Sequence, residues 1–198
     1  DAALESLLLA DLGGDPRPEL LAGFGASTAF DLRAFRAGSD HDDLTLLVRT
    51  TLGRPAGIAR LLLPTGRHLA VATDEQHPAP DLFPAPPHVA APASLHLLRA
   101  DLSLAETSAL PLPRRPGGRA FALTDGPLVG DLDGDGRDDM LLGAADPAPT
   151  ALLYVQRPDG SFAATTLVGL RPRLLVDLDA DGDPDLLASD RDHQLWVL

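Results

Sequence analysis

The 198-residue sequence contains no cysteine, no lysine and no asparagine. Without cysteine no disulfide can form, so disulfides tell nothing about the compartment. The lack of lysine excludes a P-loop lysine and a Schiff-base lysine, and the lack of asparagine excludes any N-glycosylation sequon. All 16 basic residues are therefore arginine. Together with abundant Ala, Leu and Pro, this composition suggests a GC-rich bacterial genome.

Long apolar runs and an excess of basic residues are also missing. No stretch of eighteen apolar residues occurs, so no membrane-spanning helix is expected. The formal net charge of −13 argues against a nucleic-acid groove, which needs clustered cations. The apolar content of 44 % is that of a folded globular chain. Because the sequence begins at Asp1 with no initiator methionine, we expect a processed or trimmed product.

Catalytic motifs are absent as well. There is no G-x-S-x-G elbow, no H-E-x-x-H and no Gly-rich phosphate loop, so we predict that the protein is not an enzyme. The six histidines lack the spacing of metal ligands, and we expect His77 and His88, in a proline-rich stretch, to be surface residues. The cluster at residues 40–43 (Asp-His-Asp-Asp) is predicted to be an acidic turn, with binding of a divalent ion as the alternative.

Two nine-residue acidic segments, 131–139 and 177–185, are the most informative feature that is present. Each has Asp at positions 1, 3, 5 and 9 and Gly at position 6. Such carboxylates can converge on one calcium ion, which takes six to eight oxygens at about 2.3–2.6 Å, and position 7 would add its backbone carbonyl. Glycine at position 6 fits a left-handed backbone. The predicted ligands are Asp131, Asp133, Asp135, Arg137 and Asp139 in one loop, and Asp177, Asp179, Asp181, Asp183 and Asp185 in the other.

An EF-hand is the first alternative for these loops, but it needs a glutamate at position 12 and flanking helices. Position 12 is Leu142 in one loop and Ala188 in the other. The flanks are short apolar runs, which predict strands, so each loop is expected at the tip of a β-hairpin. Position 8 of the first loop, Asp138, is expected to point away from the ion. Two Ca²⁺ ions would change the net charge from −13 to −9 and should therefore couple metal binding to folding.

The segment 129–143 resembles the FG-GAP repeat of integrin-alpha-type β-propellers and of related bacterial surface proteins, and 175–189 is a second copy. The resemblance implies that each loop joins two strands of a propeller blade and binds calcium through the aspartates named above. It also implies an exported protein, located extracellularly, at the cell surface or in the periplasm. Extracellular calcium modules bind with dissociation constants of about 10⁻⁴–10⁻³ M, which suits such a location.

Weaker copies of the same hairpin occur earlier in the chain. Residues 7–23 carry acids at positions 1, 5 and 9, but position 3 is Gly13 and position 6 is Pro16. Proline cannot adopt a positive φ, so we expect this hairpin to persist with its metal lost or weakened. Residues 58–72 form a fourth copy in which a short Pro64-Thr-Gly66 turn replaces the loop and needs no ion.

Second strand pairs follow these hairpins at 29–36 with 44–50, 95–101 with 107–112, and 151–156 with 163–168. We therefore predict an all-β fold of β-propeller blades, about three and a half four-stranded units, as part of the seven-bladed propeller that the resemblance implies. The expected repeats are 1–56, 57–118 with a Pro-rich insertion at 75–94, 119–169, and a partial repeat at 170–198. Tyr154 and Trp196 are expected to pack in the core or between blades.

The predicted function is a non-enzymatic, calcium-stabilised platform for protein or glycan contacts. The expected partners are other protein chains or further blades of the same protein, with glycans as a second class, and neither nucleic acid nor a membrane span is expected. Two alternatives stay open. In the first alternative, the chain is a structural subunit of a large cell-envelope or surface assembly. In the second, it is a non-catalytic propeller domain attached to a polysaccharide-active enzyme.

Overall fold

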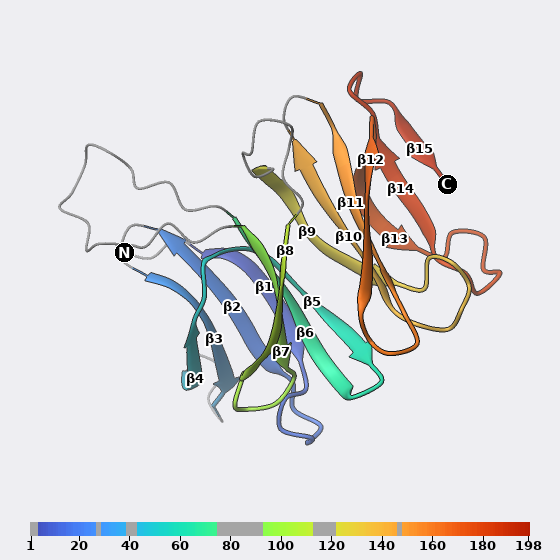
Figure 1. Cartoon of the computed structure of the whole chain (residues 1–198). Helices are drawn as coiled ribbons and strands as arrows, with labels where there is room; N and C mark the ends of the chain where they lie inside the picture. The colour runs from blue at the N-terminus through green and yellow to red at the C-terminus, as the bar shows by residue number, and fades with distance from the viewer. Residues whose placement is uncertain (1–3, 27–28, 39–42, 75–92, 113–121, 146–147) are drawn as a thin grey trace, which may run out of the picture. The chain divides into compact units, whose positions relative to one another are not determined.

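The computed structural model describes residues 4–26, 29–38, 43–74, 93–112, 122–145 and 148–198. Over these residues the chain forms strands in four antiparallel sheets (Figure 1), which confirms the all-β prediction. The described part of the chain offers no helix that could span a membrane. His77, His88, residues 40–42 of the acidic cluster and most of the Pro-rich stretch lie outside the described residues.

Each sheet is a meander in which strands that follow one another in sequence are neighbours. The first sheet holds β1 (Leu4–Ala10), β2 (Glu19–Ala26), β3 (Ala29–Ala37) and β4 (Leu44–Thr51). The second holds β5 (Arg54–Leu63), β6 (Gly66–Asp74), β7 (Ser94–Arg99) and β8 (Glu106–Pro111). The third holds β9 (Ala122–Gly130), β10 (Asp139–Ala145), β11 (Thr150–Gln156) and β12 (Phe162–Val168), and the last holds β13 (Arg171–Val176), β14 (Asp185–Ser189) and β15 (Leu195–Val197).

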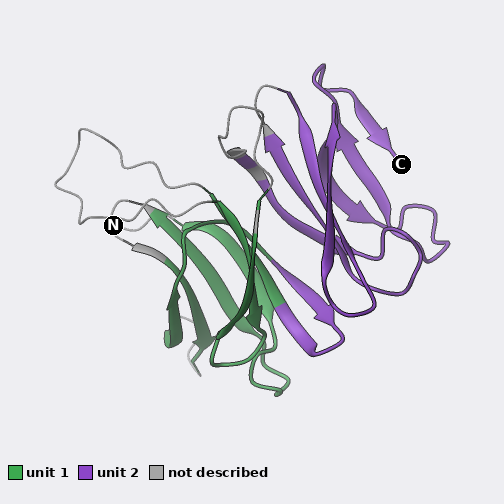
Figure 2. Ribbon diagram, in the orientation of Figure 1, with its two compact units in different colours: residues 1–58, 69–112 green, residues 59–68, 113–198 purple. Residues whose placement is uncertain are grey.

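This arrangement of sheets is the one expected of propeller blades. Three sheets have four strands and the last has three, and pairing among the described strands stays within each sheet. The chain divides into two compact units, residues 1–58 with 69–112 and residues 59–68 with 113–198 (Figure 2). The β5–β6 hairpin is shared, because its tip at 59–68 belongs to the second unit.

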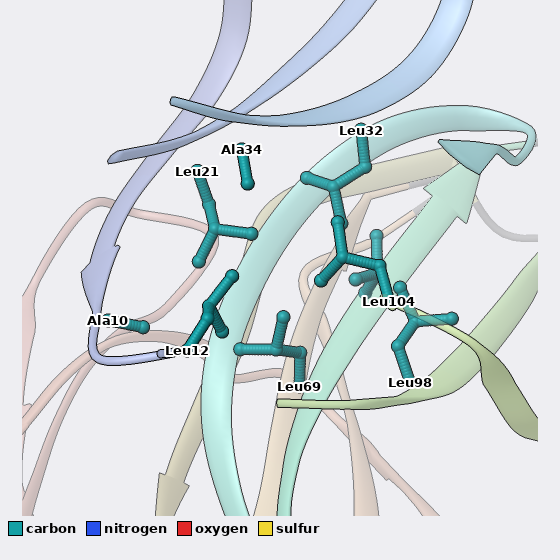
Figure 3. Close-up of a cluster of buried hydrophobic side chains, with 9 residues drawn as sticks. Ala10, Leu12, Leu21, Leu32, Ala34, Leu69, Leu98 and Leu104 are labelled. Atoms are coloured by element: carbon teal, nitrogen blue, oxygen red, sulfur yellow. The ribbon is translucent and has the colours of Figure 1, made fainter. Parts of the chain in front are cut away.

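The core of the first unit follows from the alternation of side chains along its strands. Across the first sheet, Leu8 pairs with Leu21, Leu21 with Ala34, and Ala34 with Val48, so these side chains share one face. This face contributes to a buried cluster drawn in Figure 3. The buried members of the cluster are Ala10, Leu12, Leu21, Leu32, Ala34, Leu69, Val71, Leu98 and Leu104.

In the second unit, β10 is the most deeply buried strand. Its successive residues Met140, Leu141 and Leu142 are all buried, so both faces of the strand are covered. Tyr154, which pairs with Met140, is only 2 % exposed, as predicted, and burial raises the pKa of its hydroxyl to about 12. Trp196 is not part of a core within the described residues, and its packing between blades stays a prediction. Its side chain is 47 % exposed on the outer strand β15, where its indole N–H donates to Asp190 Oδ2 at 3.0 Å.

Truncating a leucine of the first sheet tests this assignment of the core. Leu32 is 0 % exposed and Leu44 is 56 % exposed. We expect Leu32→Ala to lower the free energy of unfolding by about 2–5 kcal/mol, because it leaves a cavity. Leu44→Ala should change it by about 0.5 kcal/mol or less. Urea denaturation measures both, and equal losses would contradict the burial of Leu32.

Candidate metal-binding loops

Three acidic loops connect the first two strands of three different sheets. They are residues 11–18 between β1 and β2, 131–138 between β9 and β10, and 177–184 between β13 and β14. Position 9 of each loop is the first residue of the second strand, namely Glu19, Asp139 and Asp185. Strand pairing therefore fixes the position of this carboxylate at the base of the loop.

The carboxylate at position 9 closes each loop by accepting a hydrogen bond from the backbone N–H of position 2. The three bonds run from Leu12 N to Glu19 Oε2 at 2.9 Å, from Leu132 N to Asp139 Oδ2 at 3.0 Å, and from Leu178 N to Asp185 Oδ2 at 2.8 Å. The three loops thus share one closing contact although their other residues differ. This contact joins the start of each loop to the base of the second strand.

The carboxylate at position 1 organises the tip of the loop. Asp131 accepts hydrogen bonds from the backbone N–H groups of Gly134 at 2.9 Å, Asp135 at 3.0 Å and Gly136 at 2.7 Å. The bond from Gly136 contributes most to lowering the pKa of Asp131, since these bonds stabilise its charged form. Gly182 N donates in the same way to Asp177 at 3.1 Å. Both position 1 carboxylates are therefore tied to the loop backbone.

The backbone conformation confirms the reason given for glycine at position 6. Gly136 has a φ of 81° and Gly182 a φ of 100°, both in the left-handed region. The backbone at position 4 is also in the left-handed region, which was not predicted from the sequence. Position 4 is glycine in two loops, Gly14 and Gly134, with φ of 71° and 77°, but Ala180 in the third, with a φ of 61°. Glycine at position 4 of two loops could have predicted this conformation, but the alanine of the third loop interrupts the repeat.

Positions 1, 3 and 9 come together in both predicted metal loops. One group is Asp131, Asp133 and Asp139, and the other is Asp177, Asp179 and Asp185. In each group one oxygen per residue lies within 4.8 Å of the others. Oxygens bound at about 2.4 Å to one calcium ion are at most about 4.8 Å apart, so both groups fit this cation. Carboxylate oxygens are also the ligands that calcium prefers.

Position 5 does not join these groups. The Oδ1 atom of Asp135 accepts the Arg137 backbone N–H at 2.9 Å, and its Oδ2 forms an ion pair with the Arg137 guanidinium. In the last loop Asp181 accepts the Asp183 N–H at 2.9 Å. The ligand roles of Asp135 and Asp181, and of the carbonyls of Arg137 and Asp183, therefore stay predictions.

Asp139 is the one buried aspartate of the two predicted metal loops. It is 0 % exposed, and this burial raises its pKa. The N–H groups of Gln156, at 2.8 Å, and of Leu132 act in the opposite direction, while the negative charges of Asp133 and Asp135 raise the pKa further. A cation beside these residues would favour the charged form of Asp139.

Asp138 has a role that the sequence did not reveal. As expected, its side chain lies outside the group, but it accepts the backbone N–H of Leu62, at the tip of the β5–β6 hairpin, at 2.7 Å. The buried Gln156 side chain donates to the Leu62 carbonyl at 3.0 Å and to the Asp138 carbonyl at 2.9 Å. Within the second unit, these hydrogen bonds therefore connect the loop and Gln156 to Leu62 in the segment 59–68. No local pattern marks such a contact.

These observations define a class, an all-β repeat protein with aspartate-lined loops at corresponding hairpin tips. The FG-GAP-like repeat family matches residues 131–188, a span that contains both metal-loop candidates. The resemblance stated from the sequence is thereby confirmed for this part of the chain. A comparison with curated proteins found no match.

The closing role of position 9 can be separated from a ligand role by working in chelator. Asp139→Ala should leave the N–H groups of Leu132 and Gln156 without their acceptor, and such a loss costs about 1–3 kcal/mol per buried group. Asp133 is exposed and accepts one long bond of 3.2 Å, so Asp133→Ala should cost about 0.5 kcal/mol or less. Urea denaturation in EDTA gives both values. Similar losses would show that Asp139 does not close the loop.

Proposed function

We propose that this chain is part of a non-enzymatic, calcium-stabilised β-propeller platform of an exported bacterial protein that mediates protein or glycan contacts. The observation that carries the proposal is the pair of aspartate triads at positions 1, 3 and 9 of two corresponding hairpin loops. Their spacing, their oxygen chemistry and the irregular loop backbone suit calcium better than a smaller ion that demands octahedral geometry.

In this proposal calcium has a structural role. Each nine-residue loop contains five aspartates, and their mutual repulsion opposes the compact loop. A divalent ion offsets that repulsion and fixes the hairpin tip, which is part of the surface that a partner meets. The proposal places the protein outside the cytoplasm, at the cell surface, in the medium or in the periplasm, where the calcium concentration suits the weak affinity typical of extracellular calcium modules.

An exposed apolar face supports a partner made of protein. The face of the first sheet opposite its core carries five exposed leucines, Leu4, Leu7 and Leu9 on β1 and Leu44 and Leu46 on β4. β1 and β4 are the two edge strands of this sheet, and exposed apolar edge strands are rarely left uncovered in native proteins. We infer that further blades of the same protein or another chain cover this face. The same observation favours the second candidate, a structural subunit of a large envelope or surface assembly.

Among the described residues, the arrangement that most resembles a catalytic group is Thr73 with His96 and Glu106, and the burial of Thr73 argues against catalysis. Thr73 Oγ1 lies 3.1 Å from His96 Nε2, and His96 Nδ1 lies 2.9 Å from Glu106 Oε1. This order resembles a nucleophile, a base and an orienting acid. However, Thr73 is only 1 % exposed and its hydroxyl also donates to the Ser94 carbonyl at 3.2 Å. A substrate has no access to such a hydroxyl, so the contacts fit a role in joining β6, β7 and β8.

Calcium titration tests the proposal. We expect chelator-treated protein to bind about two ions by isothermal titration calorimetry. Since calcium at about 100 times its Kd contributes roughly 2.7 kcal/mol per site, millimolar calcium should raise the melting temperature by several degrees. The double variant Asp133→Ala, Asp179→Ala should lose both effects.

Asp192→Ala is the matched control, because it removes one exposed carboxylate outside both groups and should leave binding intact. A melting temperature that is the same in calcium and in EDTA would refute the proposal.

A further inference from the structure

The first acidic loop faces a cation of its own. Arg36, near the end of β3, donates from Nε to Glu19 Oε1 at 2.9 Å, and its Nη2 contacts the same oxygen. Nη2 also lies 3.3 Å from Asp15 Oδ2. The guanidinium thus engages the acids at positions 5 and 9 of the loop.

The glycine at position 3 indicates where this guanidinium sits. A Cβ atom on Gly13 would lie 2.8 Å from Arg36 Nη2, closer than real Cβ contacts allow. In the two later loops position 3 is aspartate, and its carboxylate joins the metal group. Position 9 also joins that group in the later loops, whereas in the first loop it contacts Arg36. In the first loop the guanidinium therefore pairs with position 9 and occupies the space that a side chain at position 3 would take.

Strand register explains why only the first loop, and not the loop at 131–138, has an arginine beside its position 9 carboxylate. In the first sheet Leu20 pairs with Phe35, so Glu19 and Arg36 are the next residues along the two strands. In the third sheet Met140 pairs with Tyr154, which places Val155 beside Asp139 in the same way. Valine offers no charge, and the Arg137 guanidinium of that loop pairs with Asp135 at position 5. A cation beside Asp139 would therefore have to come from solution.

From these observations we infer that the Arg36 guanidinium takes the place of the metal ion in the first loop. Glu19, which is 0 % exposed, needs a compensating charge as Asp139 does. Burial raises the pKa of Glu19, but the hydrogen bonds from Leu12 N and from Arg36 outweigh it and leave the pKa below its usual value. Gly13 at position 3 and Pro16 at position 6 then follow as residues of a loop that needs no ion. The comparison with a metal ion rests on the proposed function, whereas the pairing of Arg36 with Glu19 and Asp15, which the test measures, belongs to the first unit alone.

A double-mutant cycle in EDTA tests this substitution of an arginine for a metal. Arg36→Gln should lower the melting temperature by about 5 °C or more, because it leaves the buried Glu19 carboxylate without its counter-charge. Arg17→Gln removes the same charge from an exposed residue of the same loop and should have little effect. Asp15→Asn keeps the Oδ1 acceptor of the Arg17 N–H. It should lower the melting temperature in the wild-type background but raise it, or leave it unchanged, in the Arg36→Gln background.

That difference between the two backgrounds is what separates a counter-cation from a merely structural arginine. If Arg36→Gln destabilises no more than Arg17→Gln, or if Asp15→Asn has the same effect in both backgrounds, the inference is wrong. Should Arg36→Gln fail to fold, the cycle is run with Arg36→Lys, which keeps the charge but loses the planar contact with two acids. The effect of Asp15→Asn should then be smaller than in the wild type, and an equal effect would overturn the inference.

Discussion

A carboxylate placed by strand pairing at the base of each acidic loop accepts the N–H of the second loop residue, and the rest of the loop is built on this contact. Because position 9 begins a strand, strand pairing holds its Cα in place. One oxygen then closes the loop, in Glu19 as in Asp139. The second oxygen is left for other partners, the Gln156 N–H in one loop and the Arg36 guanidinium in the other. The second oxygen is therefore where the loops diverge.

Several carboxylates that lie close together repel one another, and the hydrogen bonds offset this repulsion only in part. Backbone N–H groups stabilise the charge of Asp131, but Asp139 is buried beside like charges. A metal ion and a tethered guanidinium are two physical solutions. The guanidinium is always present at its site, whereas an ion contributes in proportion to the logarithm of its concentration. In our proposal, one molecule thus combines a tip that is insensitive to calcium with two that respond to it.

The features that the sequence predicted well are local. They are the hairpins, the nine-residue loops and the left-handed glycines at position 6. Each depends on residues within about one loop length, where the alternation of apolar and polar residues and the turn-forming residues can be recognised in the sequence. The features that it missed are long-range. Arg36 reaches Glu19 across 17 residues, and Asp138 reaches Leu62 across 76. Neither Arg36 nor Leu62 carries a local signal for its partner. Strand register brings Arg36 beside Glu19, whereas Asp138 meets Leu62 of another sheet through packing within the second unit. The exposure of Trp196 was missed because a strand's sequence does not say whether its outer side is covered.

The first loop also separates the path of the backbone from the identity of the cation. Its position 6 is Pro16, which cannot take the positive φ of Gly136 and Gly182. Yet the Leu12 to Glu19 bond and the Gly14 to Asp11 bond, at 2.9 and 2.7 Å, repeat the bonds of Leu132 to Asp139 and Gly134 to Asp131. The same two backbone bonds thus occur with either residue at position 6. It follows that these bonds set the path of the tip in both loops, and that the identity of the cation, the Arg36 guanidinium or a metal ion, acts mainly on the charge of the carboxylates.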